Sequence, residues 1–297
     1  MSTKPSSTAA VSRFFGIDSM LVRATRMGGS AGRAKTIIGG AIVGLTVLVA
    51  LLAPLIAPYG PDDQDLVSAL SPPTWSHPFG TDQFGRDVLS RTLFAARLDL
   101  QIAFIATVFC FVLGVLLGLG GGYFGGLADQ LVGRLVDLVI AFPSIVFIIA
   151  LIAFLGNSMT SLYIALTVTG WTAYTRILRG EVLTVKSLPY VASARALGYK
   201  NGRIIFRHVL PNVVTPAGLF WITDMVGTIL LVTSLSYLGL GPQPPTAEWG
   251  AMIAEARPFL LEAWWIPLFP GLAIMVTGIG LALLGDGLAD RLRPEAR

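Results

Sequence analysis

Six runs of apolar residues, each about as long as a membrane-crossing helix, constrain the fold of this chain more than any other feature. They lie at about 37–57, 101–121, 135–155, 158–176, 214–237 and 266–285. At about 1.5 Å per residue, each run can cross roughly 30 Å of hydrocarbon as an α-helix. Because a helix satisfies its own backbone hydrogen bonds in lipid, the sequence predicts an all-α membrane protein with six transmembrane helices.

Composition also indicates that the lipid bilayer surrounds most of the chain. The 297 residues are 54% hydrophobic and only 13% charged, whereas a soluble protein of this size needs more charge to cover its surface. The first run follows basic residues, as the apolar part of a signal peptide does, but its length exceeds the usual 7–15 or so residues. We therefore expect a membrane anchor there. The single cysteine, Cys110, excludes an internal disulfide.

The distribution of Lys and Arg predicts the orientation of the chain. If the N-terminus is cytoplasmic, 17 of the 21 basic residues fall on the inner side of the membrane. Cytoplasmic loops carry an excess of Lys and Arg, so we expect both the N-terminus and the C-terminus to be inside. The basic pI of 9.4 then reflects membrane topology and does not indicate nucleic-acid binding.

The runs divide the chain into three parts. Residues 1–36 form a cytoplasmic N-terminal tail, in which residues 12–27 are either an interfacial helix or a disordered segment. Residues 37–100 comprise the first transmembrane helix and a turn-rich outer loop. Residues 101–297 form a five-helix core, whose largest cytoplasmic loop spans about 180–212.

Motifs of catalysis and nucleotide binding are absent or fail a structural test. The sequence has no G-x-x-x-x-G-K-[ST], H-E-x-x-H or G-x-S-x-G, so we expect no enzyme activity in this chain. Gly120, Gly122 and Gly125 fit G-x-G-x-x-G, but they follow an apolar helix instead of a strand. Gly114, Gly118 and Gly122 are four residues apart, which lets a second helix approach one face closely.

Two sets of titratable residues are candidate sites. His77 with Asp82 and Asp87 could supply metal ligands, but one histidine and two separated acids favour an ordinary polar loop, and we expect no metal. Asp224 lies near the middle of the fifth run, where an isolated acid is costly. It either lines a solute path or forms a structural hydrogen bond to a neighbouring helix.

A basic segment, YVASARALGYKNGRIIFRHVLPN, occupies residues 190–212 between the fourth and fifth runs. Pro189 suits the first turn of a helix and Gly198 suits its end. A second helix is predicted from Lys200 to Val209, with basic residues along one face. Small residues at 192–194 permit close docking of another molecule on this helix–Gly–helix knuckle. The alternative is a basic loop that rests on anionic lipid.

This segment resembles the EAA loop of ABC importer membrane subunits, in which Glu-Ala-Ala, three residues, Gly and nine residues precede Ile-x-Leu-Pro. Four positions match: Ala194, Gly198, Leu210 and Pro211. Three positions differ: Ala192, Ser193 and His208. In that family the loop is the coupling helix, which seats in a cleft of the ATP-binding subunit. By this resemblance the ATPase-coupling residues are Tyr190, Ala192, Ser193, Ala194, Arg195, Leu197, Gly198 and Lys200.

Four further blocks resemble one branch of these proteins, the DppC/OppC-like permeases of dipeptide, oligopeptide and nickel importers. The blocks are HPFGTDQFGRDVLSRTLFAARLDL, GGGYFGGLADQLVGRLVDLVIAFPSI, LSYLGLGPQPPTAEWGAMI and LLGDGLADRLRP. The resemblance covers nearly all of the chain beyond residue 30. It implies the type I ABC importer permease fold, a multi-pass place in the bacterial inner membrane, and one half of a heterodimeric pore.

The resemblance also implies a set of partners. They are a DppB/OppB-like second permease, two ATP-binding subunits that hold ATP and magnesium, and a periplasmic or lipid-anchored solute-binding protein. No cofactor is expected on this chain. Five outer acids are candidates for the surface that receives the binding protein, with an ordinary solvated loop as the favoured alternative for any single one: Asp62, Asp82, Asp87, Glu248 and Glu255.

The expected substrate is a di- or oligopeptide, with nickel or another small solute as the alternative. From another class, an ATPase-independent secondary transporter would predict paired inverted repeats with broken helices. The sequence shows no convincing repeat of that kind.

Overall fold

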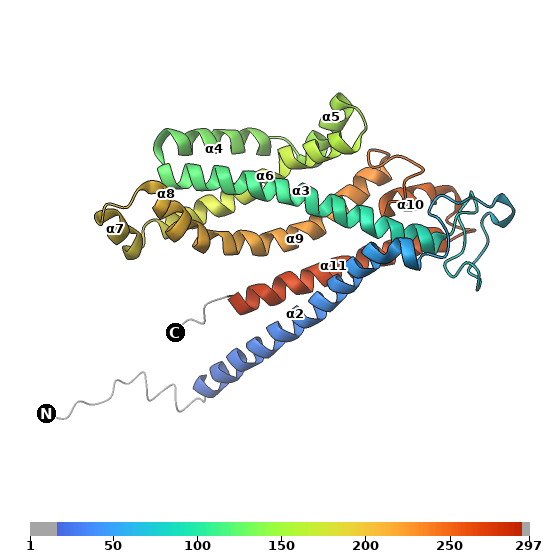
Figure 1. Ribbon diagram of the computed structural model, residues 1–297, viewed down its shortest axis with the longest axis horizontal. Helices are drawn as coiled ribbons and strands as arrows, with labels where there is room; N and C mark the ends of the chain where they lie inside the picture. Colours follow the sequence, from blue (N-terminus) through green and yellow to red (C-terminus); the bar gives the residue numbers. More distant parts are fainter. Residues whose placement is uncertain (1–16, 293–297) are drawn as a thin grey trace.

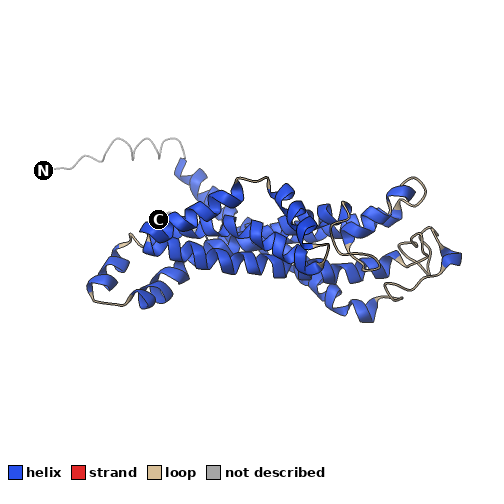
Figure 2. Ribbon diagram, turned by 90° about the horizontal axis from the view of Figure 1, so that it is seen from above, coloured by secondary structure: helices blue, strands red, loops and turns tan. Residues whose placement is uncertain are grey.

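The computed structural model describes residues 17–292, which form an all-helical fold (Figures 1 and 2). The main helices are α2 (Ile17–Ile56), α3 (Val88–Phe124), α4 (Gly126–Ile140), α5 (Ser144–Leu155), α6 (Met159–Val185), α7 (Pro189–Ala196), α8 (Asn201–Ile204), α9 (Leu210–Tyr237), α10 (Trp249–Glu255) and α11 (Trp265–Leu292). The start of α2, the end of α11 and the short helices α7 and α8 lie at one end of the bundle, called here the α7 end. Helix α10 and the loop between α2 and α3 lie at the opposite, α10 end.

Helix α3 is the central element of the bundle. Asp87 caps its first turn by accepting a hydrogen bond from the backbone N–H of Ser90, and the 37 residues extend about 55 Å at 1.5 Å per residue. The helix stops at Gly125, whose φ of 68° favours glycine. Because α3 is much longer than the hydrocarbon core is thick, it connects the two ends of the molecule.

The glycine stripe of α3 packs against α6. A Cβ atom added at the three glycines 114, 118 and 122 would lie 2.2, 2.8 and 3.0 Å from the Cβ atoms of Tyr174, Leu178 and Val182, respectively. Since the residue numbers of the contacting positions increase together in the two helices, α3 and α6 run in the same direction. The predicted packing role of these glycines is confirmed, and the backbones approach more closely than any larger residue would allow.

This close approach predicts a position-specific loss of stability. Gly114→Ala should destabilise the protein by about 1–3 kcal/mol, because the new methyl group has no room beside Tyr174. Gly120→Ala is the matched control, since a Cβ there meets no atom within 4 Å and Ala favours a helix over Gly by about 1 kcal/mol. Thermal unfolding in detergent should show a lower midpoint for the first variant only. Equal midpoints would contradict the close packing.

The prediction of one continuous helix over 135–155 is wrong. The chain breaks after Ile140, and helices α4 and α5 meet at 86°. Pro143 occupies the N-cap of α5, and a proline inside a helix loses a backbone hydrogen bond and clashes with the preceding turn. The residue before it is also driven away from helical backbone angles. The run is therefore apolar throughout but folds as two helices.

In the described chain, four helical segments are long and apolar enough to cross a membrane: Gly32–Ile56, Val88–Phe124, Asn201–Tyr237 and Trp265–Leu292. If the bent pair α4–α5 counts as one further span, the number rises to five. The predicted fourth run, 158–176, lies in α6, which is not among them. Helix α6 carries many Thr and Tyr residues and packs against α3, α5 and α9. A helix enclosed by other helices can carry polar side chains that a lipid-facing helix cannot.

Helix α2 begins earlier than predicted and packs along α11. It starts at Ile17, so the part of the N-terminal tail from Ile17 onward is continuous with the first apolar run. The rest of that tail, residues 1–16, lies outside the described residues. Near the α7 end, the Lys35 ammonium lies 3.1 Å from the Asp290 carboxylate, which joins α2 to α11.

Candidate functional site

The knuckle between α6 and α9 is built as its sequence predicts. Helix α7 begins with Pro189 in its first turn, after Leu188 in an extended conformation. It ends at Gly198, which adopts a φ of +78°. The N–H of Gly198 donates to the carbonyl of Arg195 at 3.0 Å, and the N–H of Tyr199 donates to the carbonyl of Ala194 at 3.2 Å. These two bonds form a Schellman motif, in which glycine supplies the left-handed residue.

After the knuckle the chain is helical without a break up to Tyr237. The second predicted helix is present as α8 followed by a π-helical turn, Ile205–Val209, which leads into α9. Pro211 therefore lies within this continuous helical stretch, in the first turn of α9. A proline lacks an N–H and crowds the preceding turn, and the wider π turn directly before it relieves that crowding.

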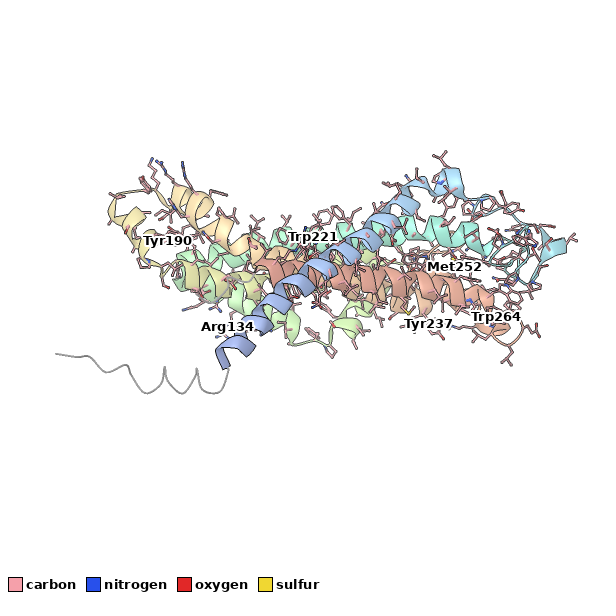
Figure 3. The ribbon with its side chains drawn as sticks, turned by 90° about the horizontal axis from the view of Figure 1, so that it is seen from below. Arg134, Tyr190, Trp221, Tyr237, Met252 and Trp264 are labelled. Carbon is pink, nitrogen blue, oxygen red and sulfur yellow. The ribbon has the colours of Figure 1, made fainter. Side chains whose placement is uncertain are left out.

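Seven of the eight predicted coupling residues are exposed at the α7 end. They are Tyr190, Ala192, Ser193, Arg195, Leu197, Gly198 and Lys200. Leu197 is 72% exposed, which is high for a large apolar side chain, and Tyr190 lies in the knuckle at the α7 end (Figure 3). Ala194 instead faces the interior with Val191, at 4% and 0% exposure. Helix α7 therefore has one face fixed to the protein and one face free for a partner.

The predicted basic face lies on the same side. Lys200, Arg203 and Arg207 are all exposed. The Arg203 guanidinium lies 4.3 Å from the centroid of the Tyr199 ring, which stacks on His208 at a centroid distance of 6.2 Å. These contacts hold Arg203 and His208 against Tyr199, which directly follows Gly198.

Asp224 has a partner on a neighbouring helix. The hydroxyl of Tyr174 in α6 donates a hydrogen bond of 2.7 Å to Oδ2 of Asp224 in α9. Of the two alternatives weighed from the sequence, the structural hydrogen bond is thus present. Oδ1 of Asp224 accepts no hydrogen bond from residues 32–292, whose side chains the structure describes, and its role in a solute path stays a prediction.

At the α10 end, most of the predicted outer acids are buried and support the loops. Asp82, Asp87 and Glu248 are 2%, 2% and 0% exposed, so the prediction that they form a docking surface is wrong. Glu248 caps α10 by accepting from the N–H groups of Gly250 and Ala251. Such carboxylates are buried because backbone N–H groups or guanidinium groups satisfy them.

The guanidinium of Arg86 joins two parts of the α10 end that are distant in sequence. Its Nε donates to Asp82 at 2.6 Å and its Nη2 donates to Glu255 in α10 at 2.7 Å. The side chain of Arg86 is 2% exposed and that of Glu255 is 18% exposed. Asp62, whose side chain is 51% exposed, is the one acid among the five that is classed as exposed, and its Oδ1 lies 3.5 Å from Nη1 of Arg91.

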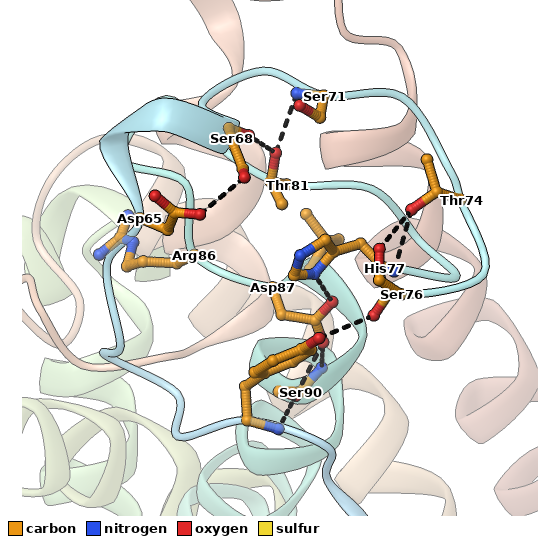
Figure 4. Close-up of polar contacts among 12 residues, drawn as sticks. Asp65, Ser68, Ser71, Thr74, Ser76, His77, Thr81, Arg86, Asp87 and Ser90 are labelled. Atoms are coloured by element: carbon orange, nitrogen blue, oxygen red, sulfur yellow. Dashed lines mark hydrogen bonds and ion pairs between the residues drawn. The ribbon is translucent and has the colours of Figure 1, made fainter.

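His77 and Asp87 form a hydrogen-bonded loop contact (Figure 4). His77 Nδ1 lies 3.0 Å from Asp87 Oδ1, while Asp87 Oδ2 accepts from both the backbone N–H and the hydroxyl of Ser90. No group of metal-binding side chains occurs among the described residues. In the same loop, hydrogen bonds from the Ser68 hydroxyl and the Val67 N–H lower the pKa of the Asp65 carboxyl.

Three long-range contacts in or near the knuckle were not predicted from the sequence. Tyr123 donates from its hydroxyl to Asn201, and Lys186 donates to the backbone carbonyl of Gly122. Arg179 of α6 binds Asp129 of α4 with two hydrogen bonds of 2.5 and 2.8 Å. The partners are 50 to 78 residues apart, so no spacing rule could have identified them.

Comparison with known proteins defines the class. Residues 84–297 match the family described as binding-protein-dependent transport system inner membrane component. This chain belongs to that family and is a membrane-embedded permease. Residues 36–73 match the N-terminal transmembrane domain of oligopeptide transport permease C, so the resemblance to DppC/OppC-like permeases is confirmed.

Individual relatives cover most of the chain. The dipeptide transport system permease protein DppC of Alkalihalophilus pseudofirmus is 38% identical over 88% of this chain and 86% of its own length. The oligopeptide transport system permease protein OppC of Bacillus subtilis is 36% identical over 88% and 85%. A crystal structure of an amino acid ABC transporter covers 68% of this chain and 94% of its own, with a TM-score of 0.53 at 13% identity, and this likeness shows the fold alone.

Proposed function

We propose that this chain is one of two pore-forming permease subunits of an ATP-driven importer of di- or oligopeptides. The observation that carries the proposal is the knuckle closed at Gly198, which presents an exposed face of α7 at one end of a membrane permease. Relatives that share about 85% or more of their length with the chain are named as dipeptide and oligopeptide permeases, which supports a peptide substrate. Nickel or another small solute is the alternative cargo.

The proposed topology has six membrane crossings with both termini in the cytoplasm of a bacterium. The crossings are α2, α3, the bent pair α4–α5, α6, α9 and α11. The concentration of Lys and Arg at the α7 end supports a cytoplasmic location for that end. The α10 end then faces outward, toward a periplasmic or lipid-anchored binding protein.

The partners follow from the division of labour in such an importer. A DppB/OppB-like permease supplies the other half of the pore, and two ATP-binding subunits supply ATP and magnesium, since this chain has no phosphate-binding loop. The exposed residues of α7 dock on one of these subunits. Asp224 is proposed to line the solute path through Oδ1, while Tyr174 holds Oδ2.

Reconstitution tests this function. The chain is co-expressed with its second permease and ATP-binding subunits, purified as a complex and placed in proteoliposomes with the binding protein. Uptake of a labelled dipeptide should require ATP, and unlabelled dipeptide should compete while nickel should not. Uptake that continues without the ATP-binding subunits would indicate a secondary transporter, and competition by nickel alone would assign the other cargo.

A further inference from the structure

The last turn of α3 is hydrogen-bonded to both flanks of α7. Lys186, which caps the end of α6 just before α7, donates from Nζ to the backbone carbonyl of Gly122 at 2.6 Å. Tyr123, the next residue of α3, donates from its hydroxyl to Oδ1 of Asn201 at 3.0 Å. Asn201 is the first residue of α8, just after α7. Two neighbouring positions of one helix therefore contact the chain before and after the knuckle.

Electrostatics favours the Lys186 contact. The last carbonyl groups of a helix have no partner within the helix and carry a partial negative charge. The carbonyl of Gly122 belongs to this set, because α3 stops at Phe124. The ammonium group of Lys186 supplies both the missing donor and the favourable charge, so the contact is stronger than a bond between neutral groups.

Packing holds Tyr123 in place. Its side chain is 7% exposed, although its hydroxyl reaches the exposed Asn201. The ring belongs to one apolar cluster with Leu119 of α3, Val191 and Ala194 of α7, and residues of α6, α8 and α9. The buried face of α7 thus belongs to the same apolar cluster as the turn of α3 that makes the two hydrogen bonds. A displacement of α7 cannot leave this turn behind without breaking them.

We propose that Tyr123 and Lys186 are positioning residues that fasten both ends of α7 to α3, so that movement of the coupling helix is passed into α3. This inference rests on the proposed coupling role of α7. At its other end α3 is bonded to α10, because Trp249 donates from Nε1 to the Thr92 carbonyl at 3.1 Å and from its backbone N–H to Asp99 at 3.0 Å. Helix α3 therefore links the ATPase-facing knuckle directly to the outer helix, in addition to the covalent links through α6 and α9.

The test measures peptide molecules imported per ATP hydrolysed by the reconstituted four-protein complex. Tyr123→Phe removes only the hydroxyl, and we expect this ratio to fall about fivefold, the effect of one hydrogen bond worth about 1 kcal/mol. ATP hydrolysis stimulated by the binding protein should stay within about twofold of the original value. Asn201→Leu should have the same effect, and Asn201→Asp, which keeps an acceptor oxygen, should retain the original ratio.

Two controls separate positioning from folding. Tyr163→Phe removes a buried tyrosine hydroxyl of α6 that has no hydrogen-bond partner in the described part of the chain, so its ratio should not change. The double variant Tyr123→Phe with Asn201→Leu should be no worse than either single variant, because both remove the same bond.

Three results would overturn the inference. They are an unchanged ratio in Tyr123→Phe, additive losses in the double variant, or equal losses of hydrolysis and uptake with a lower yield of the complex. Failure of the proposed function looks different. In that case the original chain would not co-purify with an ATP-binding subunit, and no ratio could be measured for any variant.

Discussion

Gly198→Pro is expected to abolish ATP-dependent uptake while leaving the amount of inserted protein unchanged. Proline requires a φ near −65°, whereas Gly198 has a φ of +78°. The substitution also removes the N–H that donates to Arg195 at the end of α7. The knuckle must then refold and the exposed face of α7 is no longer presented. The substitution lies outside the membrane-length helical segments, so membrane extraction and immunoblotting should give the normal amount of protein.

Gly198→Asn is the matched control for that experiment. Asparagine tolerates the left-handed region better than other residues with a side chain, so its uptake should stay within about threefold of the original. Adding a Cβ meets no atom within 4 Å, which removes crowding as an explanation. Full uptake by the proline variant, or equal loss by both variants, would contradict the coupling role of the knuckle.

Arg86→Met is expected to destabilise the α10 end by about 3 kcal/mol, at the lower end of the usual cost of breaking a buried ion pair. The variant leaves the buried carboxylate of Asp82 and the half-buried carboxylate of Glu255 without their shared guanidinium. Arg91 lies 3.7 Å from Asp82 and 3.8 Å from Glu255, so it should replace part of the lost interaction. Thermal unfolding of the purified permease complex should show a clearly lower midpoint.

Arg97→Met provides the comparison for this variant. Arg97 is exposed on α3 and forms no ion pair with any of residues 32–292, whose side chains the structure describes. Its removal should change the unfolding midpoint little, as is usual for exposed positions. If both arginine variants unfolded at the same temperature, the buried network would not be holding the loops together.

Local rules predicted the parts of the molecule that depend on neighbouring residues. Helix α7 starts at Pro189 because the fixed φ of proline suits the first turn of a helix. It is closed by Gly198 because glycine readily adopts the positive φ that ends a helix. The close packing of α3 and α6 followed from glycines spaced four apart. Resemblance to a family supplied what these rules do not contain, namely that the knuckle docks on an ATP-binding subunit.

Long-range contacts were the part that the sequence could not predict. The acids at 82, 87 and 248 looked like solvated loop residues. Their partners Arg86, Ser90 and the α10 backbone are only three or four residues away, but long-range contacts such as that of Arg86 with Glu255 form only once the loops are folded. The hydrogen bond from Tyr174 to Asp224 joins residues 50 positions apart. The break before Pro143 was missed for a different reason. The hydropathy of the sequence remains high through the break, so residues 135–155 were predicted as one helix although they contain Pro143.

Labelling of one cysteine tests most directly whether the knuckle faces the ATP-binding subunit inside the cell. Lys200→Cys is made in a Cys110→Ala background, which removes the one native cysteine. A membrane-impermeant maleimide should leave Cys-containing protein in intact cells unmodified. It should label the protein in inverted vesicles stripped of the ATP-binding subunits and label it much less when those subunits are restored. Labelling from outside intact cells would contradict both the orientation and the coupling role.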